Sequence, residues 1–163
     1  MGLSEKYEAL LARLSELESV LVAYSGGVDS TLLAFCAHAV LGDSCKAVLA
    51  SSDTYPDHEA QQARGIAASL GFTLLEVETS ELADPRFAAN TPDRCYYCKS
   101  ELFGLLCRVA EVHGLTHIAD GSNYDDLSDH RPGSRAAAEC GVVHPLQEVG
   151  LTKSEIRDLA REL

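Results

Sequence analysis

Apolar residues along the chain alternate between short runs and longer stretches with helical spacing. The short β-rich runs predict buried strands at residues 20–24, 47–50, 72–77, 116–119 and 142–143. The longer stretches predict helices at residues 3–17, 30–41, 56–70, 95–113 and 132–140, and a last helix whose N-cap is Thr152. Strands separated by helices predict an α/β fold, a three-layer sandwich in which a parallel, doubly wound sheet has helices on both faces.

The loops that leave the strand ends are the expected place for a ligand, because sheets of this kind bind ligands beyond the carboxyl ends of their strands. Three loops qualify: residues 25–30, 51–55 and 120–126.

Length and charge narrow the class of protein. The 163 residues, 46% of them hydrophobic, suit one domain spanning residues 1–163. The chain has no apolar run long enough to span a membrane, and its first residues do not resemble a signal peptide, so we expect a cytoplasmic protein without a membrane partner. A net charge of -12, with only 13 lysines and arginines, argues against a nucleic acid partner.

The first of these loops, in the stretch "AYSGGVDST" (residues 23–31), carries the clearest chemistry. Gly26 and Gly27 lie between a strand and a helix, where backbone N–H groups can approach an anion closely. Ser25 and Ser30 add hydroxyl donors. Asp29 would repel phosphates unless Mg²⁺ lies between them, so the loop predicts a Mg²⁺–polyphosphate ligand. The alternative is a tight turn in which Ser30 merely caps the helix.

The hexapeptide "SGGVDS" (residues 25–30) resembles the PP-loop of the ATP pyrophosphatases. The resemblance implies an adenine nucleotide α-hydrolase-like, Rossmann-like fold, and an enzyme that cleaves ATP between its α- and β-phosphates and transfers AMP. It implies catalytic roles for Asp29, as the Mg²⁺ ligand, and for Lys153, which stands in "LTKSEIR" where the family carries a lysine that reaches the phosphates. The implied ATP-binding residues follow three strands: Ser25, Gly26, Gly27, Val28, Asp29, Ser30, Ser51 and Gly121. The missing side chain of Gly121 is expected to clear room for the nucleotide.

Three further stretches are similar to the LarE-type ATP-dependent sacrificial sulfur transferases: "NTPDRCYYCKSELF", "DGSNYDDLSDHRPGSRAA" and "PLQEVGLTKSEIRDLAREL". This resemblance implies adenylation of a carboxylate on a pyridinium mononucleotide, which prepares that carboxylate for sulfur transfer in nickel-pincer cofactor biosynthesis. The family's sacrificial cysteine follows the "LAREL" helix, where this sequence ends. We therefore expect a truncated member that does not complete sulfur transfer. We also expect a small-molecule nucleotide substrate and a homo-oligomeric assembly.

Cys95 and Cys98 form a C-x-x-C pair at the start of a predicted helix. A redox pair and two core cysteines are both possible interpretations. The resemblance implies that in the intact protein the pair joins a later cysteine to hold a [4Fe–4S] cluster. Arg94 and Arg131 are candidates for binding the phosphate or carboxylate of the substrate, although single surface cations usually bind neither.

Two other functions fit part of the sequence. Some tRNA thiolases combine a PP-loop with a C-x-x-C pair, but the net charge of -12 argues against a tRNA substrate. A module that binds nucleotides without turnover is the non-enzymatic alternative.

Overall fold

The computed structural model describes residues 2–51, 57–78, 94–128 and 141–163. Its four strands are β1 (Val20–Tyr24), β2 (Cys45–Ser51), β3 (Leu74–Glu78) and β4 (His117–Ala119). They form one parallel sheet in the order β3-β2-β1-β4. In place of the short fifth strand expected at residues 142–143, Val143 forms an isolated parallel bridge to Ala119 of β4.

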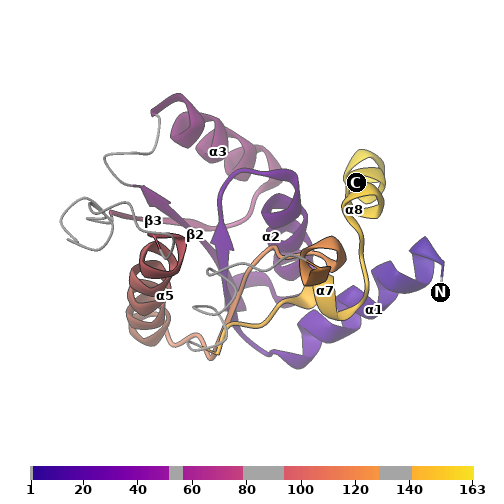
Figure 1. Cartoon of the computed structure of the whole chain (residues 1–163), viewed down its shortest axis with the longest axis horizontal. Helices are drawn as coiled ribbons and strands as arrows, with labels where there is room; N and C mark the ends of the chain where they lie inside the picture. The colour runs from indigo at the N-terminus through magenta and orange to yellow at the C-terminus, as the bar shows by residue number, and fades with distance from the viewer. Residues whose placement is uncertain (1, 52–56, 79–93, 129–140) are drawn as a thin grey trace.

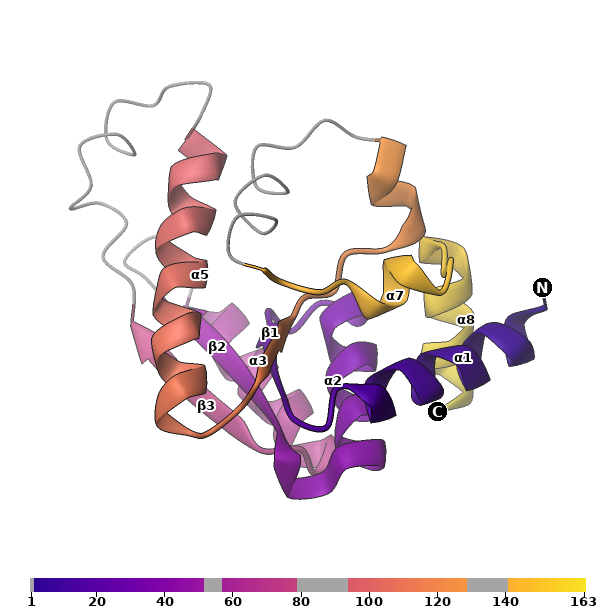
Figure 2. The ribbon, with the colours of Figure 1, turned by 90° about the horizontal axis from the view of Figure 1, so that it is seen from below.

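Helices cover both faces of this sheet. They are α1 (Leu3–Glu16), α2 (Val28–Leu41), α3 (Asp57–Leu70), α5 (Arg94–Val112), α7 (Pro145–Glu148) and α8 (Lys153–Glu162), with short 3₁₀ turns η1 (Gly42–Ser44) and η3 (Tyr124–Ser128). Figures 1 and 2 show α5 on one side of the sheet and α1, α2 and α8 on the other. The predicted three-layer α/β sandwich is confirmed.

The alternation of side chains along β1 explains the two helical layers. Val20, Val22 and Tyr24 face a core shared with α1, α2 and α8, whereas Leu21 faces a second core built with Leu106 and its neighbours in α5. A strand buried on both faces must be apolar at almost every position, which is what the run "VLVAY" supplies.

The order of the strands creates a switch point between β1 and β4. The chain proceeds outward from β1 to β2 and β3, and then returns to the other side of β1 to form β4. The loops after β1 and β4 therefore diverge from neighbouring strand ends, the geometry in which α/β sheets bind ligands.

The element boundaries agree with the sequence prediction at β1 and differ at several others. Helix α2 begins at Val28, two residues earlier than predicted, and its N-cap is Gly27 rather than Ser30. The short helix α7 was not predicted. The capping box of Thr152 and Glu155 at the start of α8 is confirmed. The helix predicted at residues 132–140 lies outside the described residues.

Within the described residues, every helix is too short or too polar to cross a membrane.

Candidate functional site

The glycine loop (residues 25–30) is fixed to helix α3. Tyr24 donates a hydrogen bond from its hydroxyl to the carbonyl of Ala63 at 2.8 Å. Gly26 has a positive φ of 86°, and a Cβ added to it would lie 2.9 Å from Cβ of Ala63. A side chain at Gly26 would therefore both strain the backbone and clash with α3, so the sequence needs glycine here.

The glycine loop places the N-terminus of α2, which lacks a side-chain cap, at the edge of the sheet. Gly27 is an N-cap without a side-chain hydrogen bond, so the first backbone N–H groups of α2 have no capping partner from it. Ser30 is buried, and its Oγ accepts a hydrogen bond from the N–H of Ser25 at 3.1 Å and lies 3.2 Å from Oγ of Ser25. Free amides, a helix dipole and two adjacent hydroxyls make this end of α2 suited to a phosphate or pyrophosphate group.

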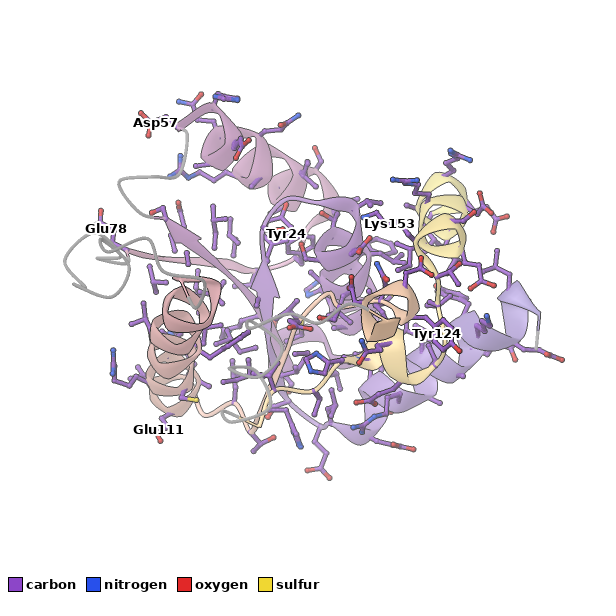
Figure 3. The ribbon with its side chains drawn as sticks, in the orientation of Figure 1. Tyr24, Asp57, Glu78, Glu111, Tyr124 and Lys153 are labelled. Atoms are coloured by element: carbon purple, nitrogen blue, oxygen red, sulfur yellow. The ribbon has the colours of Figure 1, made fainter. Side chains whose placement is uncertain are left out.

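Asp29, in the first turn of α2, is held by two residues distant in the sequence. Its Oδ1 lies 2.7 Å from Nζ of Lys153, at the start of α8, and its Oδ2 accepts a hydrogen bond of 2.8 Å from Nδ2 of Asn123. Figure 3 shows the labelled Lys153 at the end of α8 that lies toward α2. The structure thus brings together Asp29 and Lys153, the two residues predicted to be catalytic.

Asn123 belongs to the post-β4 loop (residues 120–126) and was not predicted. Its side chain is buried, and its Oδ1 has no hydrogen-bond partner in the structure, although its amide group engages Asp29. The only sequence signal for it is its place in "DGSNYDD", the loop that leaves the strand beside the glycine loop.

Gly121 allows the post-β4 loop to approach α2. A Cβ at this position would lie 2.9 Å from the backbone N and 3.1 Å from Cα of Ser30. The space that we expected to be cleared for the nucleotide is therefore taken by the backbone of α2. The close approach brings Asn123 within reach of Asp29.

A second segment of the chain, residues 143–153, is hydrogen-bonded to the post-β4 loop. Hydrogen bonds join the two, among them Asp120 N to Val143 O (3.2 Å), Gln147 Nε2 to Asn123 O (3.1 Å), Tyr124 N to Leu151 O (2.8 Å) and Lys153 N to Asp125 Oδ2 (2.9 Å). The two segments that contribute Asn123 and Lys153 are thus built as one unit.

A carboxylate–imidazole pair, formed by Asp120 and His144, lies where these two segments leave the sheet. Nδ1 of His144 lies 2.6 Å from Oδ1 of Asp120, which also accepts a hydrogen bond of 3.0 Å from the N–H of Ser122. Burial acts to raise the pKa of Asp120, but the hydrogen bonds from His144 and Ser122 and the charge of His144 together lower it. The hydrogen bond to Asp120 raises the pKa of His144, against the opposing effect of burial. This pair was not predicted from the sequence.

The remaining predicted residues lie apart from this cluster or outside the described part. Ser51 ends β2, and its Oγ lies 3.5 Å from the carbonyl oxygen of Val77. Arg94, Cys95 and Cys98 lie in the first turns of α5, but the structure does not describe their side chains, and Arg131 lies outside the described residues altogether.

The residues of the cluster fit the chemistry of a Mg²⁺–nucleotide site. Mg²⁺ is usually held by one or two carboxylates together with phosphate oxygens and water, and Asp29 supplies such a carboxylate beside the anion-binding end of α2. The orphaned Oδ1 of Asn123 leaves one further oxygen acceptor next to that carboxylate. Within the described residues, no group of three or more His, Cys, Asp or Glu side chains is arranged to hold a metal ion by itself. Among the residues that the structure describes, the protein therefore supplies only part of a Mg²⁺ coordination shell.

A cavity of about 270 Å³ lies beside the glycine loop, between α2, α3 and the end of α8, and Gly26 and Val28 of that loop contribute to its lining. Its lining is almost entirely apolar, with Leu32, Phe35 and Ile66 among the contributors. Such an apolar surface does not itself suit a phosphate group.

Comparison with known proteins identifies the family. A family model described as NAD synthase matches residues 8–93, more than half of the chain. The chain belongs to the NAD synthase family. This family lies within the PP-loop superfamily, so the resemblance drawn from "SGGVDS" is confirmed.

Curated relatives match nearly all of the chain. An uncharacterised protein of Synechocystis is 42% identical over 99% of this chain and 60% of its own length. The pyridinium-3,5-bisthiocarboxylic acid mononucleotide synthase of Lactiplantibacillus plantarum is 38% identical over 99% of this chain and 59% of its own, which confirms the resemblance to the LarE-type proteins. The chain thus spans about 60% of the length of these relatives.

Solved structures of the NAD synthase family confirm the adenine nucleotide α-hydrolase-like fold. The NH3-dependent NAD synthetase from Campylobacter jejuni superposes with a TM-score of 0.78 over 99% of this chain and 73% of its own. Its sequence identity of 21% supports a shared fold and no more than that.

Proposed function

We propose that the chain is an enzyme domain that binds Mg-ATP at the glycine loop and transfers AMP to a carboxylate of a small nucleotide substrate. The observation that carries the proposal is Asp29 at the start of α2, engaged by both Lys153 and Asn123. A polyphosphate needs donors and positive charge, and this cluster offers helix amides, hydroxyls and one ammonium within a chain that is otherwise acidic.

In the proposed reaction, a carboxylate oxygen of the substrate attacks the α-phosphorus of ATP. The bond from that phosphorus to the oxygen bridging the α- and β-phosphates breaks, and pyrophosphate leaves with the bonding electrons. The first amides of α2 and the hydroxyls of Ser25 and Ser30 bind the oxygens of the departing pyrophosphate. The ammonium of Lys153 stabilises the negative charge that develops there.

Asp29 is the residue that would hold Mg²⁺ in this site. The ion, when bound, neutralises phosphate charge and orients the polyphosphate. Asn123 donates to Asp29 and fixes the plane of its carboxylate. The ammonium of Lys153 pairs with the same carboxylate and so offsets its negative charge before the nucleotide binds.

The substrate class rests on one relative. The protein of Lactiplantibacillus plantarum is named a synthase of a pyridinium bisthiocarboxylic acid mononucleotide. We infer a pyridinium mononucleotide carboxylate as the acceptor of AMP, and sulfur transfer in nickel-pincer cofactor biosynthesis as the step that follows. Arg94 and Arg131 are proposed to bind the anionic groups of that substrate.

Several further expectations stay predictions. They concern ATP contacts from Ser51, a [4Fe–4S] cluster on Cys95 and Cys98 in the intact protein, a single domain over residues 1–163, a homo-oligomeric assembly and a cytoplasmic location. Because this chain spans about 60% of the length of these relatives, the source of the sulfur stays outside the proposal.

The test is to identify the products formed from Mg-ATP and nicotinic acid mononucleotide or its dicarboxylated analogue, using ion-exchange chromatography. Adenylation predicts the adenylated acceptor and pyrophosphate in equal amounts, formed only with the acceptor present, and free AMP only as water hydrolyses the acyl adenylate. ADP and inorganic phosphate as the products would contradict the proposal. Tight binding of ATP without any turnover would favour the nucleotide-binding module instead.

A further inference from the structure

We propose that Asp120 and His144 act as a positioning pair, which holds the post-β4 loop against α2 and thereby sets the affinity of the glycine loop for a Mg²⁺–nucleotide. The proposal rests on the proposed function only in that the glycine loop binds such a nucleotide. It does not depend on AMP transfer.

The pair joins the ends of two neighbouring segments of the sheet. Asp120 directly follows β4, and His144 directly follows Val143, which bridges to β4. Oδ1 of Asp120 accepts both the N–H of Ser122 at 3.0 Å and the imidazole of His144 at 2.6 Å. The first contact closes a turn within the post-β4 loop, and the second ties that turn to the 143–153 segment.

The turn that Asp120 closes is the part of the loop that touches the glycine loop. Gly121 packs against the backbone of Ser30 so closely that a Cβ would lie 2.9 Å from its nitrogen. Two residues further on, Asn123 donates to Asp29 at 2.8 Å. Any loosening at Asp120 is therefore transmitted over three residues to the carboxylate of Asp29.

The charges around His144 favour its imidazolium form. Carboxylates of Asp120, Asp126 and Glu148 face it from the post-β4 loop, from η3 and from α7, and the hydrogen bond to Asp120 contributes most. Arg13 of α1 pairs with Glu148 and so offsets part of that negative charge. Above the raised pKa of His144, the contact with Asp120 loses its ionic component and weakens.

The experiment measures the affinity of the chain for Mg²⁺–α,β-methylene-ATP between pH 5.5 and 8.5, by calorimetry. Four proteins are compared: wild type, His144→Asn, His144→Ala and Asp120→Asn. The analogue cannot transfer AMP, so failure of the proposed reaction leaves this readout intact. Asparagine can replace the Nδ1 donor of His144 without titrating, so the ratio of the wild-type and His144→Asn affinities cancels the titration of the ligand itself.

We expect the wild type to bind more tightly than His144→Asn at pH 5.5, and this advantage to shrink roughly fivefold as the pH rises past the pKa of His144. His144→Ala and Asp120→Asn should bind more weakly than the wild type at low pH. A ratio that stays constant across the pH range would overturn the proposal. So would variants whose melting temperature falls while their affinity stays at the wild-type value, because the pair would then be structural only. If His144→Ala does not fold, His144→Asn and Asp120→Asn carry the test.

Discussion

Lys153 and Asp29 lie 124 positions apart in the chain, yet Nζ of the lysine is 2.7 Å from Oδ1 of the aspartate. The glycine loop contains no lysine, and the start of α8 supplies one. Lys6 of α1 fixes that start by donating to the carbonyl of Gly150 at 2.9 Å and to the carboxylate of Glu155 at 3.0 Å. The ammonium beside Asp29 is therefore held by the packing of three helices, α1, α2 and α8.

Removing this ammonium should impair the reaction more than the fold. For Lys153→Ala we expect AMP transfer to fall about 100-fold to 1,000-fold, the usual cost of losing one donor that stabilises transition-state charge. Steady-state rates of pyrophosphate release measure this loss. Arg161→Ala, which removes an exposed cation from the same helix, is the matched control and should stay near the wild-type rate. Equal losses in the two variants would contradict a specific role for Lys153.

Asp29 should govern the response to divalent cations. Asp29→Asn keeps the size of the side chain but removes its charge, so it should abolish or strongly weaken Mn²⁺ binding in the presence of ATP. Electron paramagnetic resonance of free Mn²⁺ reports this directly. Asp158→Asn, which alters an exposed carboxylate on α8, serves as the control. Unchanged Mn²⁺ binding in Asp29→Asn would show that the metal is held elsewhere.

A methyl group at Gly121 should push the post-β4 loop away from α2. We expect Gly121→Ala to lower the free energy of unfolding by about 1–3 kcal/mol, the usual range for overpacking, and to weaken ATP binding as well. Gly104→Ala is the matched control, because nothing lies within 4 Å of its Cβ position in α5 and alanine favours helices by about 1 kcal/mol. Urea denaturation of both variants measures the contrast. A Gly121→Ala protein as stable as the wild type would contradict this prediction, because the post-β4 loop would then accommodate the methyl group without loss of stability.

The Asp120–His144 pair should make stability depend on pH. The folded pKa of His144 is raised above its ordinary 6.5, so the ionic stabilisation is fully present below that value and is lost as the pH rises through the folded pKa. The folded pKa of Asp120 is lowered below its ordinary 3.8, so its contribution is lost only as the pH falls below that value. The free energy of unfolding of the wild type relative to His144→Asn should therefore be greatest between about pH 4 and 6.5. An equal difference at pH 6 and pH 9 would contradict this.

The sequence predicted the layers of the fold and the chemistry of the glycine loop because both depend on local patterns. The run "VLVAY" is apolar at every position, as a strand buried on both faces must be, and β1 has the predicted bounds. The loop after it combines glycines, hydroxyls and one carboxylate within six residues. The approach of Lys153 was implied by family resemblance, and no local pattern could have given it.

The start of α2 argues against the alternative interpretation of the glycine loop, a tight turn in which Ser30 caps the helix. The helix was predicted to begin at Ser30, and it begins at Val28. In the structure the extended backbone of Gly27 starts the helix, and the hydroxyl of Ser30 instead accepts the N–H of Ser25.

The rest of the site depends on contacts between distant segments. Asn123 meets Asp29, and Asp120 meets His144, only because β4 returns to the side of β1 and Val143 bridges to β4. A single sequence carries no periodicity or spacing that pairs such residues.

The most direct test of the account is ATP–[³²P]pyrophosphate exchange catalysed by the wild-type chain with a pyridinium mononucleotide carboxylate. Exchange requires that AMP transfer be reversible and that pyrophosphate be the leaving group. We predict label in ATP that depends on both Mg²⁺ and the carboxylate, and that is lost in Lys153→Ala. Bound ATP that acquires no label when the carboxylate is added would contradict the central claim that this site adenylates its substrate.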